Sequence, residues 1–163
     1  ALLPELKKPE QKIEDMFNPQ GKERMLTRIN ALTPTTKALW GKMSVEQMLA
    51  HCNVAYEIVH EPGKHAAPGA IGKFFARVFA RGVVTGDKPY QQGSPTAPMF
   101  VIKDPRNFEV EKVRLIAYIN KTFEQGAVYY DGLENMTFGK LSSKEWNTLF
   151  SKHLDHHLRQ FGV

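Results

Sequence analysis

Apolar residues recur at helical spacing in four long segments of this sequence, and this pattern limits the fold more than any other feature. Two of the segments begin with a capping box, in which Ser44 is followed by Gln47 and Ser142 by Glu145. Runs of strand-forming residues are short and isolated. We therefore predict an all-α protein, a four-helix bundle. The expected helices begin after Asn18, Ser44, near Asn107 and after Ser142, and the first three end near Leu32, His60 and Gln125.

The 163 residues, 42% of them hydrophobic, are enough for one domain, so we treat residues 1–163 as a single unit. Residues 1–17 are rich in proline and charge and are predicted to form an N-terminal arm. Residues 62–105 are predicted to form a long, mostly irregular crossover with one short amphipathic helix near residues 71–81. We expect this helix and residues 82–100 to cover the mouth of a pocket.

The short crossover helix carries two kinds of side chain. Its aromatic residues are expected to pack into the core or to form a lid, and its basic residues to form a solvated face. The aromatic residues are Phe74, Phe75 and Phe79, and the basic residues are Lys73, Arg77 and Arg81.

Charge and composition exclude several classes of protein. The net charge is +5, from 22 basic and 17 acidic residues that alternate along the chain, so we expect no nucleic-acid partner. No segment reaches the roughly 18 uninterrupted apolar residues of a membrane helix, and we expect no membrane partner. The apolar run at residues 1–4 is too short for a signal-peptide core, although a leader removed upstream would leave no trace.

The single cysteine, Cys52, lies on the apolar stripe of the second predicted helix. We expect a buried, unreactive thiol rather than a nucleophile or a metal ligand. One cysteine allows no internal disulfide, which fits a cytoplasmic location.

The last predicted helix carries two histidines near the middle of its apolar stripe. His153 and His157 are four residues apart, so both rings project from the same face. On the same helical wheel His156 lies at the edge of the stripe, and Asp155 points toward solvent. Two imidazole rings on a buried face need polar partners, because burying them without hydrogen bonds is costly.

Histidines at this spacing commonly hold a transition metal, as in zinc proteases with the HExxH motif. In this chain Leu154 stands where those proteases have a catalytic glutamate, so the protease motif is absent. His51, on the bundle-facing half of the second predicted helix, is the natural third ligand. Three histidines with an open fourth position are typical of a catalytic metal site. Imidazole ligands suit zinc, nickel, copper or iron, and of these we expect zinc or nickel. The spacing leaves open that each histidine is a core residue bonded to a backbone carbonyl.

Two glutamines are placed to orient the histidine rings. Gln47 precedes His51 by one turn, and Gln160 follows His157 by about one turn. We expect both to act as hydrogen-bond partners of these ligands.

Other candidates near the pocket have two interpretations each. His156 is either a proton-transfer group or a surface histidine, and the surface interpretation is favoured. Tyr56 and Glu57 are candidate pocket residues. His60 and His65 flank a loop and are expected to be exposed, with the pocket still within reach.

Three blocks of sequence resemble the DinB/YfiT-like superfamily, within it a branch described only as a domain of unknown function. They are residues 40–52 (WGKMSVEQMLAHC), 94–119 (SPTAPMFVIKDPRNFEVEKVRLIAYI) and 138–163 (FGKLSSKEWNTLFSKHLDHHLRQFGV). The resemblance runs from about residue 18 to the end. It implies a four-helix bundle with a long crossover between its second and third helices. It also implies a divalent metal held by one histidine of the second helix and two of the last, which here are His51, His153 and His157.

Members of this superfamily include thiol-dependent transferases and isomerases that act with small thiol cofactors, and they often pair as dimers. The resemblance implies a metal-dependent enzyme of unknown substrate, a hydrolase or a thiol-dependent transferase, with water or a thiolate at the open position of the metal. It also implies a low-molecular-weight thiol cofactor and a homodimer. The alternative is a non-enzymatic helical module that dimerises through an apolar helix face, with structural or vestigial histidines.

Overall fold

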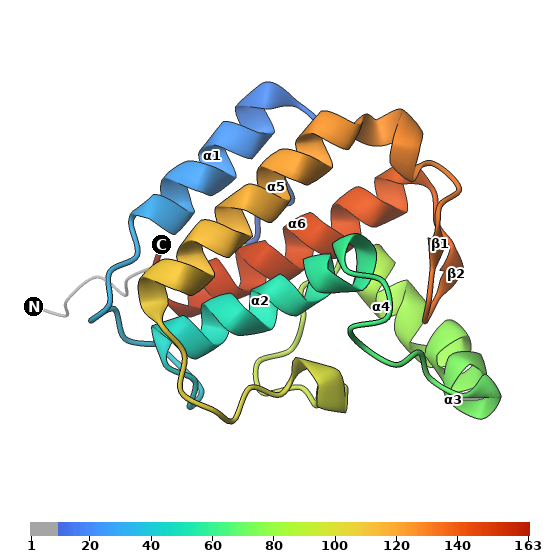
Figure 1. The fold of residues 1–163 in the computed structure, drawn as a ribbon, viewed down its shortest axis with the longest axis horizontal. Helices are drawn as coiled ribbons and strands as arrows, with labels where there is room; N and C mark the ends of the chain where they lie inside the picture. Colours follow the sequence, from blue (N-terminus) through green and yellow to red (C-terminus); the bar gives the residue numbers. More distant parts are fainter. Residues whose placement is uncertain (1–9) are drawn as a thin grey trace, which may run out of the picture.

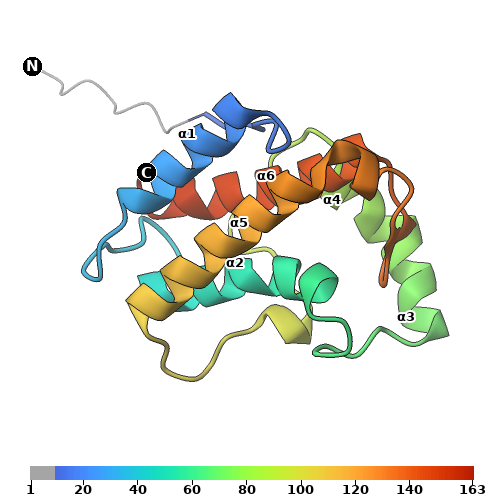
Figure 2. The same cartoon turned by 45° about the horizontal axis from the view of Figure 1, so that its top comes forward.

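The computed structural model describes residues 10–163, and its helices confirm the all-α prediction (Figure 1). The four longest helices lie side by side, and a crossover helix lies at one end of them (Figures 1 and 2). Among residues 10–163, none of the helices combines the length and apolar character needed to cross a membrane. The four long helices are α1 (Pro19–Asn30), α2 (Val45–His60), α5 (Phe108–Tyr130) and α6 (Ser143–Gln160).

The helices begin where their capping residues predict. In α2 the Ser44 hydroxyl accepts the Gln47 N–H at 3.3 Å, and the Gln47 side chain accepts the Ser44 N–H at 3.1 Å. The same reciprocal pair joins Ser142 and Glu145 at the start of α6. Gly126, with φ of 80°, interrupts α5 at the predicted end, and one further helical turn follows it.

The last helix, α6, lies in the interior and contacts α1, α2, α4 and α5. The expectation that Asp155 points toward solvent is wrong, because this side of α6 is covered by α1. The Asp155 carboxylate is fully buried and accepts hydrogen bonds from Arg28 of α1 at 2.8 Å and from Arg159 at 2.9 Å. Arg28 also donates to the carbonyl of Val163, which holds the end of the chain against α1.

The N-terminal arm is described from residue 10 onward, and residues 1–9 lie outside the described part. Met16 is buried, and its N–H donates to the side-chain oxygen of Asn147 at 2.8 Å. The Ser151 hydroxyl and the Asn147 amide both donate to the carbonyl of Glu14. The described end of the arm is therefore bonded to α6.

The crossover helix is longer than predicted. It begins as α3 (Ala70–Phe75), continues as a π-helical turn, η1 (Ala76–Ala80), and ends as α4 (Arg81–Thr85). Residues 82–85 were expected to be irregular, so that prediction is wrong for these four positions. The rest of the crossover contains a short 3₁₀ turn, η2 (Pro98–Phe100).

This crossover helix presents its largest apolar side chains to solvent. The expectation that the phenylalanines pack into the core or form a lid is wrong, because Phe74, Phe75 and Phe79 are 61%, 53% and 67% exposed. Arg81 faces the domain instead. Its guanidinium binds the Glu145 carboxylate at 3.2 Å and the carbonyl of Lys140 at 3.1 Å.

A small antiparallel hairpin lies beside the crossover helix (Figure 1). It is formed by β1 (Glu134–Asn135) and β2 (Gly139–Lys140), and the sequence analysis did not predict it. The Asn135 side chain accepts the N–H groups of Thr137 and Phe138, which stabilises the tight turn.

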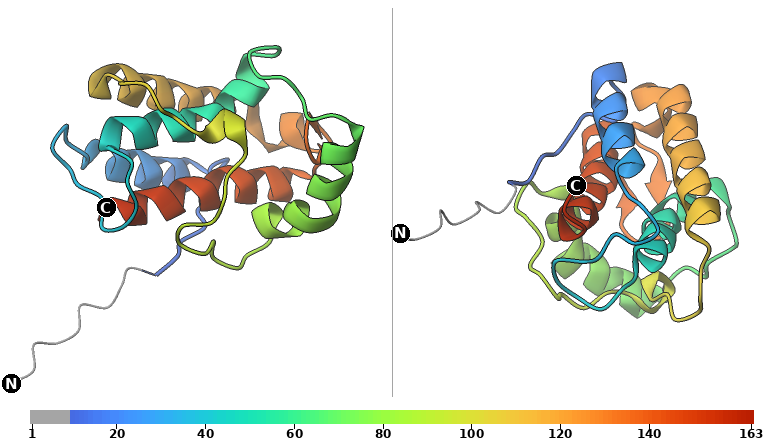
Figure 3. Two further views of the ribbon diagram at one scale, coloured as in Figure 1. Left: turned by 90° about the horizontal axis from the view of Figure 1, so that it is seen from below. Right: turned by 90° about the vertical axis from the view of Figure 1, so that its left-hand side faces the viewer.

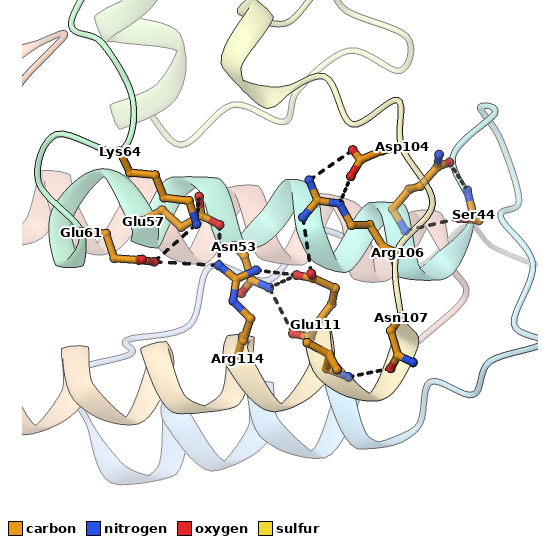
Figure 4. A network of polar contacts seen from close by, with 12 residues as sticks. Ser44, Asn53, Glu57, Glu61, Lys64, Asp104, Arg106, Asn107, Glu111 and Arg114 are labelled. Carbon is orange, nitrogen blue, oxygen red and sulfur yellow. Dashed lines mark hydrogen bonds and ion pairs between the residues drawn. The ribbon is translucent and has the colours of Figure 1, made fainter.

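Polar groups hold α2 against α5 (Figure 4). Arg114 binds Glu57 at 2.6 Å and Glu111 at 2.7 Å, and the Asn53 amide donates to Glu111 at 2.9 Å. The buried side of α5 is therefore shared between apolar residues and the charged residue Glu111, whereas Val113 is exposed.

We predict that Asp155→Asn lowers the free energy of unfolding by about 3 kcal/mol, because it removes the charge that compensates two largely buried arginines. Asp104→Asn is the matched control. Asp104 also pairs with an arginine, but its side chain is 65% exposed, so its loss should cost less than about 1 kcal/mol. Urea unfolding of the two variants measures both values, and equal losses would contradict the assignment.

Candidate metal centre

The packing of α2 against α6 brings together the three histidines that the sequence analysis selected. His51 of α2 and His153 and His157 of α6 each offer a ring nitrogen, and these atoms all lie within 4.8 Å of one another. The Nε2 atoms of His51 and His153 are 2.9 Å apart. His51 and His157 are buried and His153 is partly buried. The three residues therefore lie close enough to bind one metal ion.

Hydrogen bonds from the protein orient two of the three rings. The Nδ1 atom of His51 lies 2.8 Å from the carbonyl oxygen of Phe100, and Nδ1 of His157 lies 2.7 Å from Oε1 of Gln160. The Gln160 amide donates from Nε2 to the carbonyl of Trp40 at 2.9 Å, which leaves its oxygen for His157. Both oxygens are acceptors, so each Nδ1 carries the proton and each Nε2 has a free lone pair.

The two glutamines thus have different roles. Gln160 lies where the sequence analysis expects it, on the ring of His157. Gln47 does not hold His51, because its side-chain oxygen accepts the N–H of Ser44 in the cap of α2. The backbone carbonyl of Phe100 takes that position on His51. A backbone acceptor on a crossover 49 residues away carries no signal in the sequence, so this partner could not be predicted.

Burial keeps all three rings in their neutral form. It lowers the pKa of His51, lowers that of His153 well below the ordinary value, and lowers that of His157 to about 3. The neighbouring histidines lower the pKa values of His153 and His157 further, because two positive rings would repel each other. A neutral imidazole is the form that binds a metal.

The donor set fits a divalent transition metal. Nitrogens that share a tetrahedral zinc at about 2.0–2.1 Å are about 3.3 Å apart, and the 2.9 Å separation between His51 and His153 is close to this value. Three neutral imidazoles without a thiolate or carboxylate suit zinc, nickel, copper or iron rather than magnesium or calcium.

The three histidines line a cavity of about 790 Å³. α2, α4, α6 and the crossover contribute to its wall, and residues 90–102 supply much of it. The ribbon of this part of the crossover runs across α2 and α6 in the view from below (Figure 3). This part of the crossover shapes the pocket as expected. The crossover helix contributes only Ala80 and Val84.

His156 also lines this cavity, so the favoured interpretation as a surface histidine is wrong. It is 8% exposed, its ring packs edge-on against Trp40 and Tyr90, and burial lowers its pKa to about 4. Its Nδ1 atom has no hydrogen-bond partner within residues 10–163. Tyr90 was not selected from the sequence, since a lone tyrosine in an irregular segment gives no periodic signal.

Four other candidates lie away from the cavity. Tyr56 stacks on Phe150 in the core at 4.6 Å between ring centres. Glu57 belongs to the network between α2 and α5, and it also binds His65 at 2.8 Å. His60 is half-buried and lies 3.0 Å from a hydroxyl of α5. The predictions that Tyr56 and Glu57 are pocket residues, and that His60 and His65 are exposed, are therefore wrong.

Cys52 is fully buried in the core, as predicted, and burial raises the pKa of its thiol. A thiol that stays protonated is a poor nucleophile and a poor metal ligand. Within residues 10–163, the group of side chains close enough together to share a metal ion is the three histidines.

Comparison of this chain with protein-family models, with curated proteins and with solved structures finds no match in any of the three.

We predict that the metal-free protein loses stability as the pH falls below about 6.5. The lowered pKa values mean that the unfolded chain binds protons on these histidines before the folded chain does. Each histidine that stays neutral in the fold contributes up to about 1.4 kcal/mol per pH unit between pH 6.5 and its lowered pKa. Urea unfolding at pH 7, 6 and 5 measures the slope. His156→Phe should reduce this slope by the contribution of about one proton. A free energy of unfolding that does not change with pH would contradict the burial of neutral rings.

We also predict that Gln160→Met weakens zinc binding by about 10- to 100-fold, because the ring of His157 loses the acceptor that orients it. Gln47→Met is the matched control, and it should leave zinc affinity unchanged because Gln47 serves the cap of α2. Competition with a chromogenic chelator measures both affinities. Equal effects of the two substitutions would contradict the different roles assigned to Gln160 and Gln47.

Proposed function

We propose that this protein is a DinB/YfiT-like, metal-dependent enzyme, a hydrolase or a thiol-dependent transferase, with His51, His153 and His157 as its metal ligands. The observation that carries the proposal is the convergence of three ring nitrogens at a cavity, with the Nδ1 atoms of two rings bonded to carbonyl oxygens. Histidines with only a structural role in the core would make these hydrogen bonds, but their other ring nitrogens would not need to converge.

The order of elements supports the same proposal. α1 and α2 precede a long crossover, α5 and α6 follow it, and the four helices pack together. The DinB-like bundle implied by the sequence has this order, with one histidine on its second helix and two on its last.

The residues of the chain have separate roles in this proposal. The Phe100 carbonyl and the Gln160 amide hold the rings of His51 and His157 in the tautomer that leaves Nε2 free. A divalent metal, when bound, supplies Lewis acidity and makes a water or a thiol more acidic near neutral pH. The cavity wall places a substrate beside the ligands and keeps bulk water away from them.

We predict about one zinc or nickel per chain in the wild-type protein, purified without a histidine tag, and a loss of metal in His51→Ala, His153→Ala and His157→Ala. His65→Ala is the matched control, because His65 is a partly buried histidine that lies outside the cavity. Elemental analysis measures the content, and circular dichroism checks that each variant keeps its helices. Wild-type protein that takes up no added zinc or nickel would overturn the proposal.

A second candidate function rests on the exposed face of the crossover helix. Ile71, Phe74 and Phe79 are each more than 60% exposed, although side chains of this size are usually buried. This face favours a helical module that pairs with a second copy of the chain. Absence of metal, together with a dimer that Phe74→Ser and Phe79→Ser dissociate in sedimentation experiments, would favour the module over the enzyme.

A further inference from the structure

The part of the cavity wall that residues 10–163 form carries no charged side chain. Its polar groups are imidazoles, amides and hydroxyls, and none of its residues is an aspartate, glutamate, lysine or arginine. Most of the wall is apolar, with Ile58 of α2, Val84 of α4 and Leu149 of α6 among its residues. A cavity of about 790 Å³ falls within the range of about 300–1,000 Å³ that is usual for sites of small organic molecules.

Two charged residues that lie beside the histidines on α6 are held by other partners. Lys152 directly precedes His153, but its ammonium group is buried against the carbonyls of Val83 and Gly86 and lies over the ring of Tyr90. The Asp155 carboxylate is paired with two arginines. These groups cannot pair with a charge on a bound molecule without breaking their own contacts.

An ionised group in such a cavity would lose its hydration without gaining a partner of opposite charge, and this loss is costly. We therefore propose that the cavity takes a neutral, mostly apolar substrate with one metal-binding group at its reacting end. The assignment of the reacting end rests on the proposed function, whereas the choice of a neutral body rests on the wall alone. A thiol that carries several carboxylates or amines does not fit this wall.

The first test uses alkyl hydroxamates, which bind metals through one end. Octanohydroxamic acid and suberic monohydroxamate have chains of equal length, but the second ends in a carboxylate. With the zinc-loaded protein at pH 7.5 we expect the neutral-tailed compound to bind at least tenfold more tightly in isothermal titration calorimetry. Equal binding, or tighter binding of the carboxylate, would overturn the inference.

Two neighbouring substitutions test the wall directly. Val84 lines the cavity, whereas Val83 is 53% exposed and does not line it. Val84→Glu should weaken the binding of octanohydroxamic acid at least tenfold, and it should strengthen the binding of a hydroxamate with a terminal ammonium group. Val83→Glu introduces the same charge one residue away and should change neither of these two affinities. If both variants behave like the wild type, the apolar wall does not contact the ligand and the inference is wrong.

A metal-free test separates this inference from the proposed function. N-phenyl-1-naphthylamine is neutral and has no strong metal-binding group, and its fluorescence rises in apolar sites. We expect it to bind the metal-free protein and to lose binding in Val84→Glu but not in Val83→Glu. Such binding without any zinc uptake would overturn the proposed function and support the neutral cavity. Zinc uptake without this pattern would support the metal site and overturn the neutral cavity.

Discussion

The structure depends on helix α6, which is buried on nearly every side although seven of its eleven buried residues are polar. Several polar side chains of α6 are bonded to different parts of the chain: Ser151 to the arm, Lys152 to the end of α4, His153 to α2 and Asp155 to α1. Gln160 adds a bond to the loop before α2. A buried polar group without a partner costs more than its bond contributes, so these partners specify where each neighbouring element must lie.

The candidate metal centre follows from the same constraint. His153 and His157 lie on the side of α6 that meets α2, and the partner available there is another histidine, His51. The Phe100 carbonyl and the Gln160 amide occupy the outer nitrogens of His51 and His157, which leaves the inner nitrogens facing one another. Three neutral rings in this arrangement can each turn one nitrogen lone pair toward a shared metal ion. A divalent transition metal satisfies all of them at once.

The sequence predicts the features that depend on local patterns. The caps at Ser44 and Ser142, the interruption at Gly126 and the apolar stripes of α1 and α2 all follow from residue types at fixed spacing. The juxtaposition of the three histidines follows from the same helical spacing. The wrong predictions concern positions where the sequence pattern does not show which other segment covers the side of a helix. A helical wheel of α6 assumes one solvent face, so Asp155 and His156 were placed outside, but α1 and the crossover cover them. The wheel of the crossover helix assumes an apolar face toward the domain, whereas Arg81, Ala80 and Val84 face it.

The most direct test of this account is a long-range ¹H–¹⁵N spectrum of the histidine rings, recorded before and after one equivalent of zinc is added. The account predicts that His51 and His157 already carry their proton on Nδ1 in the metal-free protein. It also predicts that zinc shifts the Nε2 signals of His51, His153 and His157 and leaves those of His60 and His65 unchanged. Binding through Nδ1, or zinc-induced shifts confined to other histidines, would contradict it.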